Sequence, residues 1–104
     1  MLDKTKAREI AVKYAEEVRK ELSPQTIILF GSYVNGTPHE YSDIDIAVVV
    51  YDYTGDWLEA SANLVGLAWK FEGSIEPHLM DETCDRSGFL EHIKKTGEII
   101  YQEA

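Results

Sequence analysis

The sequence predicts an α/β (α+β) domain in which helices pack on a small mixed β-sheet, in the element order α-β-β-α-β-α. Three segments carry apolar residues at helical spacing, and three short apolar runs rich in β-branched residues lie beside them along the chain. The chain has 104 residues, of which 44% are hydrophobic. This size and composition suit one buried core. We therefore expect residues 1–104 to form a single domain.

Three helices are expected, because hydrophobic residues recur every three to four positions in three parts of the chain. The predicted ranges are Asp3–Leu22, Trp57–Glu72 and Gly88–Thr96. In the first helix, the residues predicted to face the core are Ala7, Ile10, Ala11, Tyr14, Ala15, Val18 and Leu22. In the second, they are Leu58, Leu64, Val65, Ala68 and Trp69.

The helix ends are predicted from residues that can satisfy unpaired backbone groups. Asp3 and Ser87 are the expected N-caps of the first and third helices, because a short polar side chain can accept a hydrogen bond from the first turn. Gly73 and Gly97 are expected to end the second and third helices, since glycine adopts the left-handed conformation at low cost. One further helical turn is expected over Ser32–Asn35.

Short apolar runs predict the strands of the sheet. The predicted strands are Thr26–Phe30, Asp43–Tyr51 and Ser74–Met80, with a further short strand at Glu98–Tyr101. The second strand is apolar on both faces after its aspartates, which favours a central position. Pro77 lacks the backbone N–H that a central strand needs, so the third strand is expected at an edge or a bulge.

The residues around the start of the second strand predict the functional site. Asp43 and Asp45 are two positions apart, so their side chains should lie on the same side of the strand. Two adjacent carboxylates repel each other, and a divalent cation bound by both removes that conflict. Gly31 and Ser32 follow the first strand, where the backbone amides of a turn can bind phosphate oxygens. These four residues predict a site for a metal ion and a phosphorylated ligand.

This pattern resembles the signature of the nucleotidyltransferase superfamily that includes polymerase β. The resemblance rests on Gly31-Ser32, ten intervening residues and then Asp43-Ile44-Asp45. The short chain and the later segment Ile75-Glu76-Pro77-His78 narrow it to the minimal nucleotidyltransferase (MNT) proteins of prokaryotes. The similarity covers residues 27–80 and implies a polymerase-β-like nucleotidyltransferase fold.

The resemblance implies a magnesium-dependent enzyme that transfers a nucleoside monophosphate, with ATP the expected donor, to a hydroxyl group. Asp43 and Asp45 would ligate the two Mg²⁺ ions expected with bound nucleotide, and Glu76 would complete the metal site or act as general base. Gly31 and Ser32 would hold the β- and γ-phosphates. MNT proteins are often encoded beside a HEPN-domain protein. The expected acceptor is therefore a tyrosine of a HEPN toxin, with this chain as the antitoxin.

Departures from the family pattern keep two further interpretations open. The third carboxylate is usually aspartate in relatives, and many relatives place an arginine in the Gly-Ser turn, where this chain has Tyr33 and Asn35. No lysine or arginine lies between Lys20 and Lys70, so His39 is the available cationic candidate in the loop. One alternative is a binding module that neutralises a HEPN partner by contact alone. The other is a nucleotide-binding regulatory subunit that never transfers.

Net charge and composition restrict the classes of partner that the chain could bind. The net charge of −9 argues against a long nucleic acid, which would need a basic groove, and permits a nucleotide carried with magnesium or a basic protein. The composition is compatible with assembly either with further copies of this chain or with a different protein. No apolar run approaches the ~20 residues of a membrane span. Cys84 is the single cysteine, which agrees with a reducing cytoplasm.

Overall fold

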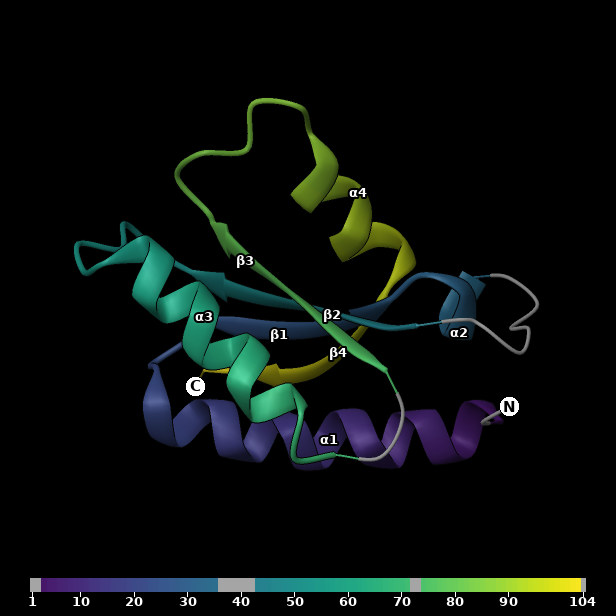
Figure 1. The fold of residues 1–104 in the computed structure, drawn as a ribbon. Helices are drawn as coiled ribbons and strands as arrows, with labels where there is room; N and C mark the ends of the chain where they lie inside the picture. The colour runs from purple at the N-terminus through teal and green to yellow at the C-terminus, as the bar shows by residue number, and fades with distance from the viewer. Residues whose placement is uncertain (1–2, 36–42, 72–73, 104) are drawn as a thin grey trace.

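The computed structural model describes residues 3–35, 43–71 and 74–103. The predicted α/β architecture is confirmed, and within these described residues four helices and four strands alternate along the chain (Figure 1). Their bounds are α1 Lys4–Glu21, β1 Thr26–Phe30, α2 Ser32–Asn35, β2 Ile44–Val50, α3 Trp57–Ala68, β3 Ile75–Asp81, α4 Phe89–Thr96 and β4 Glu98–Gln102. The single turn expected after the first strand is α2, and the short last strand is β4.

The strands form one mixed sheet in the order β3-β2-β1-β4. β1 runs antiparallel to both β2 and β4, whereas β2 and β3 are parallel. β2 is central, as its apolar faces predicted, and β3 is an edge strand, as Pro77 predicted. The parallel pair brings the starts of β2 and β3 together, because their register aligns Ile44 with Ile75.

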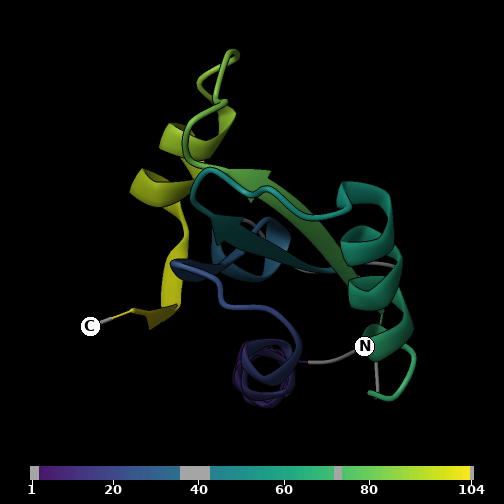
Figure 2. The ribbon, with the colours of Figure 1, turned by 90° about the vertical axis from the view of Figure 1, so that its left-hand side faces the viewer.

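α1 and α3 cover one face of the sheet and α4 covers the other (Figures 1 and 2). Alternate residues of β1 and β2 divide between the two faces. The α1–α3 face takes Ile27, Leu29, Ile44, Ile46 and Val48. The α4 face takes Ile28, Phe30, Ala47 and Val49. Asp45 lies between Ile44 and Ile46, so strand alternation places it on the α4 face.

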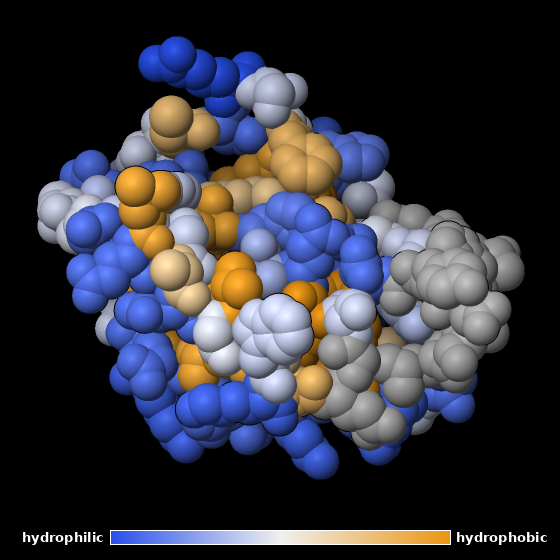
Figure 3. All heavy atoms as spheres, in the orientation of Figure 1, coloured by the Kyte–Doolittle hydropathy of each residue, from blue (hydrophilic) through white to orange (hydrophobic). Residues whose placement is uncertain are grey.

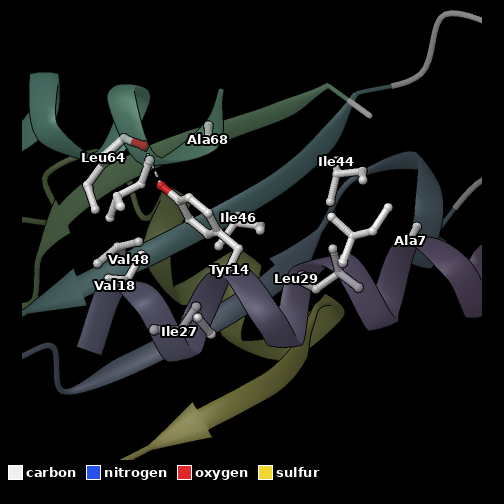
Figure 4. Packing of buried hydrophobic residues seen from close by; sticks show 14 of the residues in the cluster. Ala7, Tyr14, Val18, Ile27, Leu29, Ile44, Ile46, Val48, Leu64 and Ala68 are labelled. Carbon is white, nitrogen blue, oxygen red and sulfur yellow. Dashed lines mark hydrogen bonds between the residues drawn. The ribbon is translucent and has the colours of Figure 1, made fainter. Parts of the chain in front are cut away.

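α1 confirms the sequence prediction. Asp3 is its N-cap and accepts a hydrogen bond of 2.7 Å from the backbone N–H of Lys6. All the predicted core residues up to Val18 are buried, and Leu22 packs against the core from its edge. The Tyr14 hydroxyl donates a 2.7 Å hydrogen bond to the Leu64 carbonyl oxygen, which joins α1 to α3 inside the core (Figure 4).

The prediction for the core face of α3 was partly wrong. Leu64 and Ala68 are buried, but Leu58, Val65 and Trp69 are 81%, 46% and 85% exposed. The helix also buries Ala60 and Leu67, so its buried face is rotated about the helix axis relative to the predicted face. α3 carries apolar residues at helical spacing on two faces, and tertiary packing selected the face with smaller residues. The other apolar face of α3 stays exposed, which leaves apolar atoms at the surface over this helix (Figure 3).

Three element ends also differ from the prediction. α3 ends at Ala68, earlier than expected, and the predicted stop at Gly73 lies outside the described residues. β2 begins at Ile44, so Asp43 stands just before the strand. Gly88, with φ +75°, is the N-cap of α4 in place of Ser87.

The Asp85 side chain satisfies the first turn of α4 from further back in the loop. Its carboxylate accepts hydrogen bonds from the backbone N–H groups of Leu90 at 3.0 Å and Glu91 at 3.1 Å. The loop before α4 folds back to bring this carboxylate over the helix end, which local sequence rules do not foresee. Gly97 ends α4 as predicted. None of the described helices is long and apolar enough to cross a membrane.

Candidate active site

The predicted site residues meet at one end of the sheet, where β1 ends and β2 and β3 begin. Asp45 on β2 is aligned with Glu76 on β3 in the parallel register. Phe30, the last residue of β1, is aligned with Asp45 from the other side. Gly31, the next residue along the chain, therefore lies directly beside Asp45. Sheet pairing thus places the Gly-Ser turn, the second aspartate and the third carboxylate on three adjacent strands in that order.

His78 joins the carboxylates from β3. Its Nε2 atom lies 3.4 Å from Asp45 Oδ1 and 3.9 Å from Glu76 Oε1. One ligand atom from each of these three side chains lies within 4.8 Å of the others, close enough to hold one metal ion. The side chains of Asp45, Glu76 and His78 are 23%, 55% and 32% exposed, so the cluster is open to a ligand from solvent.

Electrostatics in this cluster favour an added cation. Partial desolvation, and then the neighbouring Asp45 and Asp43 carboxylates, raise the pKa of Glu76 although His78 opposes the shift. A hydrogen bond with Asp45 is the main cause that raises the pKa of His78. The neighbouring carboxylates contribute to both shifts, and His78 compensates their negative charge when it is protonated. A divalent cation would supply that compensation more completely.

Asp43 completes the set of carboxylates without being part of the tight cluster. It is exposed, stands just before β2, lines the same pocket as Glu76 and helps to raise the pKa of that residue. The three predicted carboxylates therefore lie together, and their oxygen atoms suit a hard cation such as Mg²⁺. His78 is a nitrogen donor and a poorer ligand for that ion, so we assign it to holding the Asp45 carboxylate.

Gly31 forms the sharp turn that brings the chain past Asp45. Its φ of +85° lies in the left-handed region, and a Cβ atom at this position would overlap Asp45 Oδ2. The Val34 backbone N–H donates a 3.0 Å hydrogen bond to the Gly31 carbonyl oxygen, which closes the turn into α2. Ser32, the first residue of α2, is half-buried beside it. The turn therefore presents backbone, not side chain, to the carboxylates.

His39, His78 and Trp69 have three different outcomes. The loop that contains His39 lies outside the described residues. His78 contacts the site and also packs its ring against Phe30 at 5.2 Å between centroids. Trp69 was predicted to lie in the core, but it lines a pocket of about 340 Å³ together with Asp43 and Glu76. No local signal distinguishes this exposed indole from a buried one.

Comparison with known proteins identifies the family. A family model described as a nucleotidyltransferase domain matches residues 12–102. A Methanocaldococcus jannaschii protein, provisionally named a protein adenylyltransferase, is 40% identical over 52 residues. That match covers 50% of this chain and 59% of the relative, so the chain matches less than two thirds of the relative's length.

Solved structures share the fold. A Sulfolobus solfataricus protein, provisionally named a nucleotidyltransferase, superposes with a TM-score of 0.69 at 20% identity, covering 96% of this chain and 84% of that one. A complex of tri-AMPylated Shewanella oneidensis HEPN toxin with MNT antitoxin gives a TM-score of 0.57 at 22% identity, covering 91% of this chain and 72% of the other. The family model spans the Gly-Ser turn and all three carboxylates, and the chain therefore belongs to the nucleotidyltransferase domain family.

Proposed function

We propose that the protein transfers AMP from ATP to a hydroxyl group of an acceptor protein, in a magnesium-dependent reaction. The observation that carries this proposal is the alignment of Asp45 with Glu76 on parallel strands, with the Gly31 turn against Asp45. This arrangement puts paired carboxylates next to a backbone turn of a kind that suits phosphate oxygens. The family match supports the same reaction class.

Each residue has a role that follows from its position. Gly31 and Ser32 bind the β- and γ-phosphates through the turn, because Gly31 leaves the backbone bare. Asp43 and Asp45 would hold Mg²⁺, and Glu76 would complete that site or accept the acceptor's proton. When bound, the ions neutralise charge on the triphosphate and the leaving pyrophosphate. His78 orients Asp45 through its 3.4 Å contact.

The acceptor we propose is a HEPN-domain toxin, which would make this protein its antitoxin. The Shewanella oneidensis HEPN toxin that shares a structure with an MNT antitoxin is AMPylated, and the Methanocaldococcus jannaschii relative is named for protein adenylylation. Both names support a protein acceptor and an adenylate donor. A net charge of −9 suits a basic partner surface.

A second candidate function is neutralisation of the same partner by contact, without transfer. Tyr33 favours it, because its side chain is 4% exposed and packs in the core. A buried tyrosine cannot take the part that an arginine in this turn plays in relatives. Among the described residues of the turn, only backbone amides would then be available, with magnesium, to meet the phosphate charge.

Calorimetry with a non-hydrolysable ATP analogue, with and without Mg²⁺, tests the proposed site. We expect magnesium-dependent binding at micromolar to millimolar affinity, lost in Asp45→Asn. Glu9→Gln removes one negative charge from the exposed side of α1 and is the matched control. Absence of heat from the wild-type protein in either condition, with analogues of all four nucleotides, would refute nucleotide binding and leave contact neutralisation.

A further inference from the structure

The outer side of α3 carries a stripe of exposed apolar residues at regular spacing. We call it the α3 stripe, and it consists of Leu58, Ala62, Val65 and Trp69, all of them exposed. Among the described residues, three of the seven large hydrophobic side chains that stay exposed lie in this stripe. Trp69 continues the spiral of the helix, because its φ of −64° and ψ of −16° are helical. The described part of the chain therefore leaves a continuous apolar stripe open to solvent.

The residues of the α3 stripe are separated by four, three and four positions. This is the heptad spacing of coiled coils, in which the apolar stripe of one helix packs against that of another. α3 also has a separate buried face, formed by Ala60, Leu64, Leu67 and Ala68. A helix with apolar residues on more than one face is typical of a helix that is covered on each. The pattern therefore indicates that a further helix packs on the α3 stripe.

The order of residue sizes makes the stripe complementary to itself. The larger residues Leu58 and Trp69 stand at its ends, and Ala62 and Val65 stand on either side of its centre. If two copies of α3 pack antiparallel about a two-fold axis through that centre, Leu58 faces Trp69 of the second copy. Ala62 then faces Val65 of the second copy, so each layer joins a larger side chain to a smaller one.

The charges of α3 are complementary in the same orientation. The sequence from Trp57 to Lys70 contains one acidic and one basic residue, Glu59 and Lys70, and both are exposed. On an ideal helix both lie roughly 100° round from the middle of the stripe, in the same direction. In the antiparallel pair, Glu59 therefore lies next to Lys70 of the second copy, and the same contact repeats at the other end. A parallel pair would instead bring like charges together.

The net charge of the chain also favours this surface for contact between two copies. Each copy carries a net charge of −9, so two copies repel each other over most approaches. The outer side of α3 is an exception, because its one negative and one positive charge cancel. An unrelated helix would have no reason to match this order of sizes and charges. The observations therefore identify the occupant of the stripe as a second copy of this chain.

We propose that the protein forms a two-fold symmetric homodimer in which α3 packs antiparallel against α3 of the second copy. α3 lies on the side of the molecule away from α4, whereas Asp45 lies on the α4 face (Figure 2). The dimer therefore leaves Asp45 open, and the inference does not depend on nucleotidyl transfer. A single helix pair buries less than the ~800 Å² per partner of a standard interface, so we expect a dissociation constant in the micromolar range.

Sedimentation velocity of the wild-type protein between about 1 and 500 µM measures the dimer dissociation constant. Val65→Glu puts a charge beside the two-fold axis in both copies, so it should raise that constant more than about tenfold. Asn63→Glu is the matched control, because it adds the same charge to an exposed position of α3 outside the stripe. The control should stay within about twofold of the wild type. Thermal melting checks that both variants are folded.

Exchange of the two charges tests the antiparallel orientation. Glu59→Lys and Lys70→Glu each bring like charges together at both ends of the dimer, and each should raise the dissociation constant about three- to tenfold. Glu59→Lys also makes the chain less acidic, so general repulsion alone predicts the opposite change. An equimolar mixture of the two variants has opposite charges at both ends and should form a mixed dimer as tight as the wild type. A mixture as weak as its components would overturn the proposal.

Three other results would also overturn the homodimer. The first is a wild-type protein that stays monomeric over the whole concentration range. The second is a dimer that Val65→Glu leaves intact, because the contact would then lie on another surface. The third is a wild-type chain that is monomeric alone but binds a co-produced HEPN-domain partner, with binding lost in Val65→Glu and kept in Asn63→Glu. That result would show that the stripe binds a different protein.

Discussion

Gly31 and Asp45 share one corner of the sheet so closely that only a glycine leaves room for the carboxylate. A Cβ atom on Gly31 would overlap Asp45 Oδ2 and lie 3.1 Å from its Cγ. The two residues come from neighbouring antiparallel strands, because Phe30 is aligned with Asp45. The turn and the carboxylate are therefore one structural unit.

Gly31→Ala is expected to abolish magnesium-dependent nucleotide binding. The new methyl group would displace the Asp45 carboxylate, and the φ of +85° would strain an alanine backbone. Titration of the ATP analogue with Mg²⁺ by calorimetry measures the loss. Binding at the wild-type affinity would contradict the role of this turn.

Gly66→Ala is the matched control for that change. Gly66 lies on the exposed side of α3, and a Cβ atom there meets nothing within 4 Å. Alanine favours a helix over glycine by about 0.5–1 kcal/mol, so this variant should gain stability and keep nucleotide binding. Chemical denaturation measures the first effect and calorimetry the second.

Tyr14→Phe is expected to destabilise the fold by about 0.5–1.5 kcal/mol. The change removes the buried 2.7 Å hydrogen bond to the Leu64 carbonyl oxygen while keeping the ring in place (Figure 4). Burial raises the pKa of Tyr14, in keeping with a neutral hydroxyl that donates this bond. Urea denaturation compares the free energies of unfolding. An unchanged value would mean that the bond does not couple α1 to α3.

Asp81 should make stability depend on pH in acid. Hydrogen bonds from the Thr83 hydroxyl, and then from the backbone N–H groups of Tyr53, Thr83 and Asp52, lower the pKa of Asp81 from 3.8 to about 2. A pKa depressed by folding adds stability above the unfolded value, and that stability is lost as pH falls through the folded value.

The melting temperatures of wild type and Asp81→Ala test this dependence. The wild type should melt higher above about pH 5, where Asp81 is ionised in both states. The difference between the two proteins should shrink steadily towards pH 2. A difference that stays constant over this range would show that the carboxylate acts through packing and not through its charge.

The sequence was sufficient to predict helix bounds, buried faces and strand positions where the local pattern and the tertiary packing agree. α1 has one apolar stripe and a good N-cap, so its bounds and buried face were predicted correctly. β2 and β3 were placed correctly in the sheet because their apolar faces and Pro77 limit where each can pair. The grouping of the Gly-Ser turn with Asp43 and Asp45 came from spacing and family resemblance.

The sequence was insufficient to predict which helix face is buried and which side chains meet, because contacts between distant segments decide both. α3 carries two apolar faces, and only packing against β3 and α1 shows that Val65 and Trp69 face outward. The alignment of Asp45 with Glu76 depends on the parallel register of strands far apart in the chain. The role of His78 follows from that register, because the histidine reaches Asp45 only once the strands pair.

The central claim is nucleotidyl transfer at Asp43, Asp45 and Glu76, and intact-mass spectrometry of a co-produced HEPN-domain partner tests it most directly. With the wild-type protein, the partner should gain mass in whole multiples of one nucleoside monophosphate. Asp45→Asn should remove the added mass and leave association largely intact, because the site is a small part of an interface of ~800 Å² per partner. An unmodified partner, inhibited equally by wild type and Asp45→Asn, would contradict the claim.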